Sequence, residues 1–164
     1  MEDLIRVEVS AVALDRDRGA PIVFLREKEG NRVLPIWIGP FEAVSIALEL
    51  EGVKLQRPIT HDLMKLILDG LDTRVLRVEI NELKNNTYYA RIYLQKDDHI
   101  LEVDARPSDS IALALRTNAP IYIKEEVMKK GVTFEFSDES ELKNKLQHLE
   151  PEFFGEIDLG EPQI

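Results

Sequence analysis

The stretch Ile100–Arg116 constrains the fold most, because a short extended run leads into a helix that is apolar on almost every face. We expect the helix to begin at Pro107, since the first helical N–H group has no intrahelical partner and its loss there costs nothing. Asp109 then lies beside free backbone N–H groups and the positive end of the helix dipole. Residues 111–115 read Ile-Ala-Leu-Ala-Leu, and a helix that is hydrophobic all round must be buried. The sequence therefore predicts a core helix with polar side chains at its exposed start.

The composition fits one domain or two small fused units, with 164 residues of which 44% are hydrophobic. The absence of cysteine excludes a disulfide framework, a thiolate nucleophile and a Cys-based zinc site. No apolar run approaches the length of a membrane span and no signal-peptide pattern begins the chain, so we expect a cytoplasmic protein with no membrane partner. The charged fraction of 32% and the lack of cysteine favour a thermophilic source.

The net charge of −10 is concentrated in residues 132–164, which contain nine acidic and two basic residues. Tight non-specific binding of nucleic acid depends on neutralisation of phosphates by lysine and arginine. An acidic chain is a poor candidate for that kind of binding, although a local basic patch remains compatible with these counts.

The order of elements, three strands followed by two helices, occurs twice along the chain. We therefore predict an α+β fold with an internal duplication of a β-β-β-α-α unit, with mostly antiparallel sheets and helices packed on one face. Copy one covers about residues 1–70 and copy two about residues 71–131. The matched pieces are Leu4–Ser10 with Val75–Asn81, Val33–Ile36 with Ile100–Val103, Pro40–Glu42 with Pro107–Asp109, and Leu63–Lys65 with Val127–Lys129.

The acidic tail, residues 132–164, is predicted to contain a short edge strand at Val132–Phe136 and a short helix ending near Leu149. The pair Phe153-Phe154 is aromatic in an otherwise acidic segment, and it could dock on its own domain or on a neighbouring subunit. We therefore expect a homo-oligomer.

Polar residues that differ between the two copies are candidates for function, whereas shared ones indicate architecture. His61 has the neutral pKa range that suits acid–base catalysis, or it is a surface histidine at a helix start, and Thr60 before it is the expected N-cap. Asp104 could hold a divalent cation together with Asp109, or it pairs with Arg106 to stabilise the turn.

Arg106 could bind a phosphate through two hydrogen bonds, or it caps a backbone carbonyl. Asp62 follows His61 and Arg57 lies nearby in sequence, while Glu42 matches Asp109 as an acid in the first turn of a helix. The sequence contains no Walker loop, dinucleotide-binding glycine pattern, HExxH, GxSxG or EF-hand loop.

Three motifs, VLPIWIGPFEAVSIALELEG, RPITHDL and VDARPSDSIALALR, resemble those of the bifunctional nuclease domain family over about residues 5–130. The resemblance implies a small α+β domain of duplicated units that degrades both DNA and RNA. The motif positions that carry over are Glu42, Arg57, His61, Asp62, Asp104, Arg106 and Asp109.

The resulting hypothesis is a nuclease in which His61 or Asp62 activates water and Asp104 and Asp109 bind Mg²⁺ or Mn²⁺, with Glu42 as a further catalytic carboxylate. Arg57 or Arg106 would hold the scissile phosphate. Two alternatives remain open: a non-enzymatic oligomeric binding or regulatory module, and a regulatory domain for a small ligand.

Overall fold

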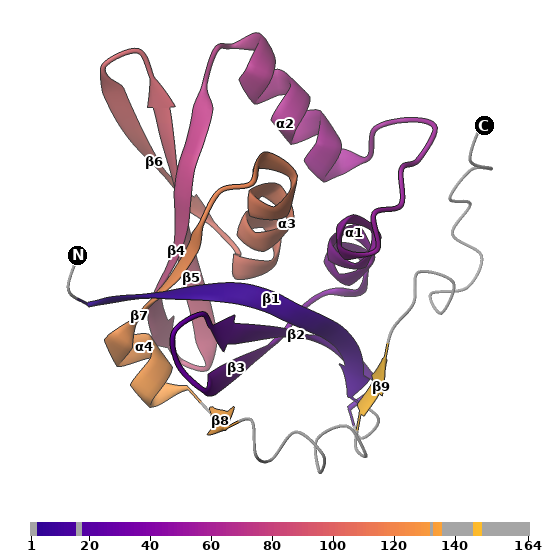
Figure 1. Cartoon of the computed structure of the whole chain (residues 1–164), viewed down its shortest axis with the longest axis vertical. Helices are drawn as coiled ribbons and strands as arrows, with labels where there is room; N and C mark the ends of the chain where they lie inside the picture. The colour runs from indigo at the N-terminus through magenta and orange to yellow at the C-terminus, as the bar shows by residue number, and fades with distance from the viewer. Residues whose placement is uncertain (1–2, 16–17, 132, 136–145, 149–164) are drawn as a thin grey trace.

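The computed structural model describes residues 3–15, 18–131, 133–135 and 146–148. Figure 1 shows a sheet with helices α1, α2 and α3 gathered on one side of it. No helix in the described residues is long and apolar enough to cross a membrane. The elements are β1 (Leu4–Asp15), β2 (Ala20–Glu27), β3 (Arg32–Trp37), α1 (Pro40–Leu50), α2 (Thr60–Gly70), β4 (Arg74–Lys84), β5 (Thr87–Lys96), β6 (His99–Ala105), α3 (Pro107–Thr117), β7 (Ile121–Lys124), α4 (Glu125–Lys130), β8 (Phe134–Glu135) and β9 (Leu146–His148).

All described strands belong to one sheet in the order β6-β5-β4-β7-β1-β2-β3-β8, and β9 pairs with β1 outside this path. Neighbouring strands pair antiparallel, except that β4 and β7 are parallel. The prediction of a mostly antiparallel α+β fold is therefore confirmed.

The predicted element order is wrong in the second half, because strand β7 lies between α3 and α4. Its four residues, Ile-Tyr-Ile-Lys, form an apolar run too short to assign by periodicity. β7 pairs with β4 on one side and with β1 on the other, so it joins the two three-stranded meanders into a single sheet. Internal duplication stays a prediction, supported by the shared order of a meander followed by a proline-started helix.

The acidic tail contributes two short strands. β8 lies within the predicted strand Val132–Phe136 and pairs with β3. The predicted tail helix is wrong at Leu146–His148, which form a strand against β1; residues 136–145 and Leu149 lie outside the described residues, as does Phe153-Phe154.

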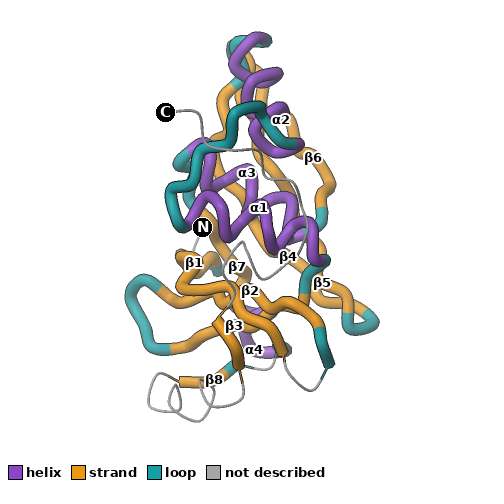
Figure 2. The backbone as a smooth tube through the Cα atoms, turned by 90° about the vertical axis from the view of Figure 1, so that its right-hand side faces the viewer, coloured by secondary structure: helices purple, strands orange, loops and turns teal. Residues whose placement is uncertain are grey.

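The core helix predicted from the sequence is α3, which begins at Pro107. Ile111 and Leu113 are at most 1% exposed, and each contributes about 1.5–3 kcal/mol by leaving water. α3 packs against α1 and α2 on one side of the sheet, whereas α4 lies apart from them at the other end (Figure 2). The prediction that the helices cover one face therefore holds for α1–α3 only.

Arg32 joins the β2–β3 hairpin to α4 through two carboxylates. Its Nε donates to Glu27 Oε1 at 2.9 Å and its Nη1 donates to Glu125 Oε1 at 3.0 Å. Burial alone raises the pKa of Glu27, but hydrogen bonds from Arg32 outweigh it and lower that pKa below 4.5. Hydrogen bonding to Arg32 likewise lowers the pKa of Glu125.

Arg32→Gln is expected to lower the free energy of unfolding at pH 7 by about 2 kcal/mol, because the charge-assisted hydrogen bonds of the guanidinium to the carboxylates of Glu27 and Glu125 are lost. Since both carboxyl pKa values are depressed in the folded state, this stabilisation is complete above pH 4.5 and is lost as the pH falls through the folded-state values. Urea unfolding of both proteins at several pH values measures it. A difference that does not shrink in acid would contradict the assignment.

Candidate functional site

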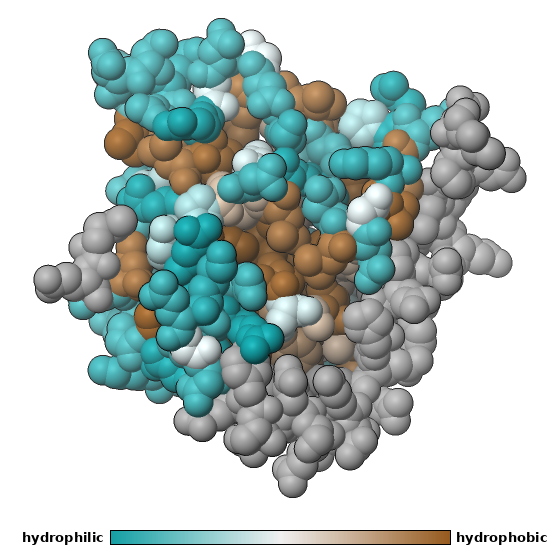
Figure 3. Space-filling view, in the orientation of Figure 1, coloured by the Kyte–Doolittle hydropathy of each residue, from teal (hydrophilic) through white to brown (hydrophobic). Residues whose placement is uncertain are grey.

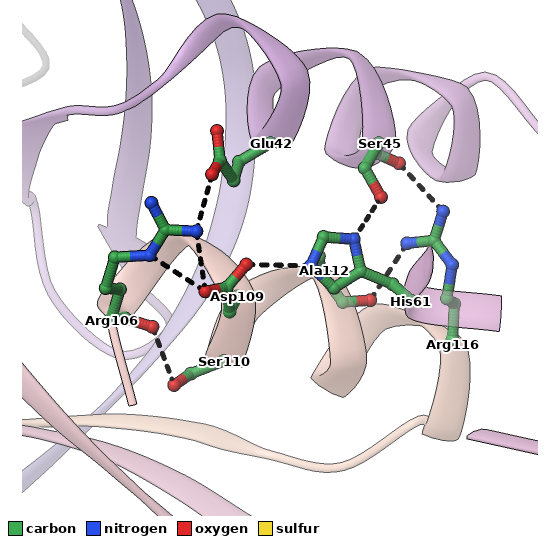
Figure 4. Close-up of polar contacts among 8 residues, drawn as sticks. All are labelled: Glu42, Ser45, His61, Arg106, Asp109, Ser110, Ala112 and Arg116. Atoms are coloured by element: carbon green, nitrogen blue, oxygen red, sulfur yellow. Dashed lines mark hydrogen bonds and ion pairs between the residues drawn. The ribbon is translucent and has the colours of Figure 1, made fainter. Parts of the chain in front are cut away.

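A chain of hydrogen bonds connects α1, α2 and α3 near their N-terminal ends (Figure 4). α1 provides two of the side chains, α2 provides the histidine, and α3 provides an aspartate together with the arginine that precedes it as N-cap. The chain runs through Ser45, His61, Asp109, Arg106 and Glu42.

His61 is buried, with 6% of its surface exposed, and it is the only buried residue of α2. Its Nε2 lies 2.9 Å from Asp109 Oδ1 and its Nδ1 lies 2.6 Å from Ser45 Oγ. An ionised carboxylate only accepts hydrogen bonds, so Nε2 carries a proton and donates it to Asp109. In the neutral ring Nδ1 is then an acceptor, and the Ser45 hydroxyl donates to it. Ser45 is therefore the hydrogen-bond donor to His61 Nδ1 in this arrangement.

Arg106 links the first turns of α1 and α3. Its Nε donates to Asp109 Oδ2 at 2.9 Å and its Nη2 donates to Glu42 Oε1 at 2.5 Å. The hydrogen bond to Asp109, and to a smaller extent the one to Glu42, raise the pKa of Arg106. The side chain is 65% exposed, and its Nη1 bonds no other described residue, so these N–H groups are available to an anion.

Gly39, the N-cap of α1, leaves room for this arrangement. A Cβ atom at that position would collide with the Glu42 carboxylate. In the predicted duplication the position that matches Gly39 is Arg106.

Asp62 belongs to a neighbouring ion pair. Its Oδ1 accepts from Arg116 Nε at 2.6 Å, and its Oδ2 accepts from the backbone N–H of Ile59 at 3.0 Å. Burial alone raises the pKa of Asp62, but these hydrogen bonds outweigh it and lower that pKa. Ile59, and not Thr60 as predicted, is therefore the N-cap of α2.

Arg116, whose side chain is 4% exposed, also donates to the carbonyl oxygens of Ala112 and Ser45. It thus connects α3 to α1 and α2 directly behind the histidine. Sequence reasoning missed both Arg116 and Ser45. The sequence did offer one signal for Arg116, a single arginine at the end of an apolar helix. An arginine in a buried helix needs a partner of opposite charge.

Asp104 and Arg57 have no hydrogen bond or ion pair with this cluster in the described residues. Asp104 lies on β6, its side chain is 70% exposed, and its ion pair is with Arg91 at 3.9 Å. Arg57 is exposed in the loop before α2. Of the seven predicted residues, the structure therefore gathers Glu42, His61, Arg106 and Asp109, and places Asp62 beside them.

The predicted cation ligands do not form a common donor set. Asp109 directs its two oxygens to His61 and Arg106, while Asp104 pairs with Arg91. The described residues contain no group of three or more histidine, cysteine, aspartate or glutamate side chains able to hold a metal ion. A divalent cation therefore does not fit this arrangement of side chains.

A pocket of about 290 Å³ opens beside the hydrogen-bonded chain. Its polar wall is formed by Ser45, His61, Arg106 and Asp109, and its rim carries Phe41, which is 77% exposed. This volume is at the lower end for ligand pockets, so it admits only a small group next to Ser45. The rest of the lining is mainly apolar, from Val44, Leu48, Leu55 and Ile59.

Comparison with known proteins confirms the family resemblance. A family model described as the bifunctional nuclease domain matches residues 23–135. An uncharacterized protein of Mycobacterium tuberculosis strain H37Rv is 38% identical over 152 residues, which cover 92% of this chain and 91% of that protein.

Plant relatives carry the nuclease name. Bifunctional nuclease 2 of Oryza sativa subsp. japonica is 31% identical over 107 residues, or 63% of this chain and 33% of that protein. Bifunctional nuclease 1 of Arabidopsis thaliana is 27% identical over 107 residues, which again cover 63% of this chain and 33% of that protein. The match thus spans about one third of the length of these plant proteins. By the extent of the family match, the chain belongs to the bifunctional nuclease domain family.

Proposed function

We propose that this protein hydrolyses phosphodiester bonds in DNA or RNA at the cluster formed by His61, Asp109 and Arg106. The proposal rests on one observation: the hydrogen-bonded side chains Ser45, His61, Asp109 and Arg106 line a pocket. In this proposal His61 is the base, and the exposed Nη1 group of Arg106 is available to bind a phosphate. The names of the plant relatives support the choice of nucleic acid as substrate.

In the proposed reaction a water in the pocket attacks the phosphorus atom. The water gives a proton to Ser45 Oγ, Ser45 passes its own proton to His61 Nδ1, and Asp109 stabilises the resulting imidazolium through Nε2. The bond from phosphorus to the leaving oxygen then breaks, and solvent or His61 returns a proton to that oxygen.

Arg106 contributes charge stabilisation. The N–H groups of its Nη1 would contact the non-bridging phosphate oxygens, where negative charge builds up in the transition state. Arg57, exposed in the loop that also carries the pocket residue Leu55, is the second candidate for a phosphate contact. Given the net charge of −10, we expect about one or two phosphates to be held, and hence weak binding with a shallow salt dependence.

The test compares purified wild type, His61→Ala and Asp104→Asn on single-stranded DNA and on RNA. His61→Ala is expected to slow cleavage at least about 100-fold, because proton transfer by a positioned side chain is lost. Asp104→Asn is the matched control and is expected to cleave like wild type, since Asp104 is exposed and pairs outside the site.

Each protein is assayed with Mg²⁺, with Mn²⁺ and with EDTA, which tests the sequence prediction of a divalent cation. Equal cleavage by wild type and His61→Ala would overturn the residue assignment. A rigorously purified wild type that cleaves neither substrate under any of these conditions would overturn the activity.

A non-enzymatic oligomeric binding module is the second candidate, because α2 exposes a row of large apolar side chains. A protein that assembles through this helix and cleaves no nucleic acid would support it. The cytoplasmic location and the thermophilic source stay predictions of the sequence.

A further inference from the structure

The serine, histidine and aspartate of the hydrogen-bonded chain are arranged as in a serine hydrolase. Ser45 Oγ lies 2.6 Å from His61 Nδ1, and His61 Nε2 lies 2.9 Å from Asp109 Oδ1 (Figure 4). An aspartate in this place fixes the tautomer of the imidazole and stabilises its protonated form. A serine hydroxyl that donates to such a base is activated as a nucleophile. The two ring nitrogens exchange roles relative to the usual triad, but the proton follows the same path from serine to imidazole.

The pocket beside Ser45 is more apolar than cleavage of a phosphodiester requires. Beyond its polar wall, the lining comes mainly from α1 and from the loop before α2: Phe41, Val44, Leu48, Leu55 and Ile59. Figure 3 shows hydrophobic residues at the surface in the region of α1 and α3. An ionised phosphate loses its hydration in apolar surroundings without compensation, whereas a short acyl chain gains by leaving water. The proposed nuclease reaction uses only the polar wall, so the apolar lining has no role in it.

The N-terminus of α2 supplies donors for an oxyanion next to Ser45. Thr60 and His61 are the first two residues of α2, and both line the pocket. The first N–H groups of a helix have no intrahelical partner. The N-cap is Ile59, whose apolar side chain cannot accept a hydrogen bond from them. These N–H groups and the positive end of the helix dipole therefore adjoin the pocket, where they favour negative charge.

We propose that Ser45 is a nucleophile and that the pocket hydrolyses small carboxylic esters through an acyl-Ser45 intermediate, an activity beyond the proposed cleavage of nucleic acid. Ser45 Oγ bonds to the carbonyl carbon while His61 Nδ1 takes the hydroxyl proton, and the carbonyl electron pair moves onto its oxygen. Return of that pair breaks the bond from the carbonyl carbon to the alcohol oxygen, which leaves with the proton held on Nδ1. Water then attacks the acyl group by the same route, and the carboxylic acid and the free serine are released.

The first test asks whether Ser45 reacts with a fluorophosphonate, whose phosphorus bonds to an activated serine as fluoride leaves. The mass of the full chain should rise by one adduct, which peptide mass spectrometry should place on Ser45. Ser45→Ala should give no adduct, and His61→Ala should react at least about 100-fold more slowly. Ser108→Ala is the matched control and should react like wild type, because Ser108 is 5% exposed, similar to Ser45 at 3%, and lines a different pocket.

The second test measures the acyl chain that the pocket accepts, with the p-nitrophenyl esters of acetate, butyrate and dodecanoate. Butyrate has two more CH₂ groups than acetate, so its kcat/KM should be about 15-fold higher, or about fourfold for each group buried. Dodecanoate should react more slowly than butyrate, because its chain exceeds a pocket of about 290 Å³. Leu55→Phe adds bulk to the apolar lining, and it should reduce the advantage of butyrate while hydrolysis of acetate continues.

The third test places a thiol at the proposed nucleophile. The chain contains no cysteine, so Ser45→Cys introduces a single thiol whose alkylation by iodoacetamide reports access from the pocket. A thiol beside His61 should ionise below the ordinary value of about 8.5. Its alkylation rate should therefore rise at lower pH than the rate of Ser108→Cys, which is the matched control.

A wild type that forms no fluorophosphonate adduct, or an adduct and ester hydrolysis that persist in Ser45→Ala, would overturn the proposal. A chain-length preference that Leu55→Phe leaves unchanged, or a thiol in Ser45→Cys that iodoacetamide does not reach, would equally contradict it. None of these measurements uses nucleic acid, so failure of the esterase leaves the proposed nuclease untouched, and failure of the nuclease leaves the esterase untouched.

Discussion

Asp109→Asn is expected to slow cleavage of single-stranded DNA and RNA by at least about 10³-fold, because the histidine would be held in the wrong tautomer. The carboxylate of Asp109 faces two donors, His61 Nε2 and Arg106 Nε. An amide of the same shape offers one oxygen and one NH₂ group. Arg106 cannot give up its protons, so the oxygen stays with Arg106 and the NH₂ group turns to His61. The ring must then protonate at Nδ1, and it can no longer accept the proton of Ser45.

Nitrogen NMR of the imidazole provides a readout that is independent of activity. Wild type should carry the proton of neutral His61 on Nε2, and Asp109→Asn should carry it on Nδ1. Thermal unfolding serves as the control, because the variant preserves the shape of the side chain. Unchanged cleavage together with a changed tautomer would show that the His61–Asp109 pair takes no part in catalysis.

The polar residues at the starts of the helices could be predicted from the sequence, but the contacts between them could not. The motifs around Pro107 and Pro40 correctly predicted two helices with an acid in the first turn. Comparison of the two halves suggested that shared acids are architecture and that unshared groups are functional. The structure combines both kinds, because Arg106 bridges Glu42, which lies 64 residues away, and Asp109. Only the packing of α1 on α3 creates that bridge.

Ser45 and Arg116 were missed for a related reason. No sequence pattern singles out Ser45, and only the fold shows that it is 3% exposed and faces His61. Arg116 follows an apolar run, and from the local sequence it would be predicted as a solvent-exposed charge. Its ion-pair partner, Asp62, lies 54 residues earlier. Strand β7 was hidden by its length and by the symmetry assumed for the two halves. In each case the deciding partner is distant in sequence.

Arg116→Met is expected to lower the free energy of unfolding at pH 7 by about 3 kcal/mol, because it leaves the partly buried Asp62 carboxylate without its partner. The methionine fills the space of the arginine stem, so the loss reports the ion pair and the hydrogen bonds to Ala112 and Ser45. Urea unfolding measures it, and the double variant Asp62→Asn/Arg116→Met should recover much of the loss, since no unpaired charge remains.

The pH dependence of this loss distinguishes the ion pair from simple packing. The folded-state pKa of Asp62 is depressed below 3.8 through Arg116, so the contribution is complete above that value and is lost as the pH falls through the folded-state pKa. The difference between wild type and Arg116→Met should therefore be largest near neutral pH and smaller at pH 3. A loss of equal size at both pH values would assign it to packing. Because Arg116 holds α1, α2 and α3 together behind His61, the same variant should also weaken cleavage even though it touches no substrate.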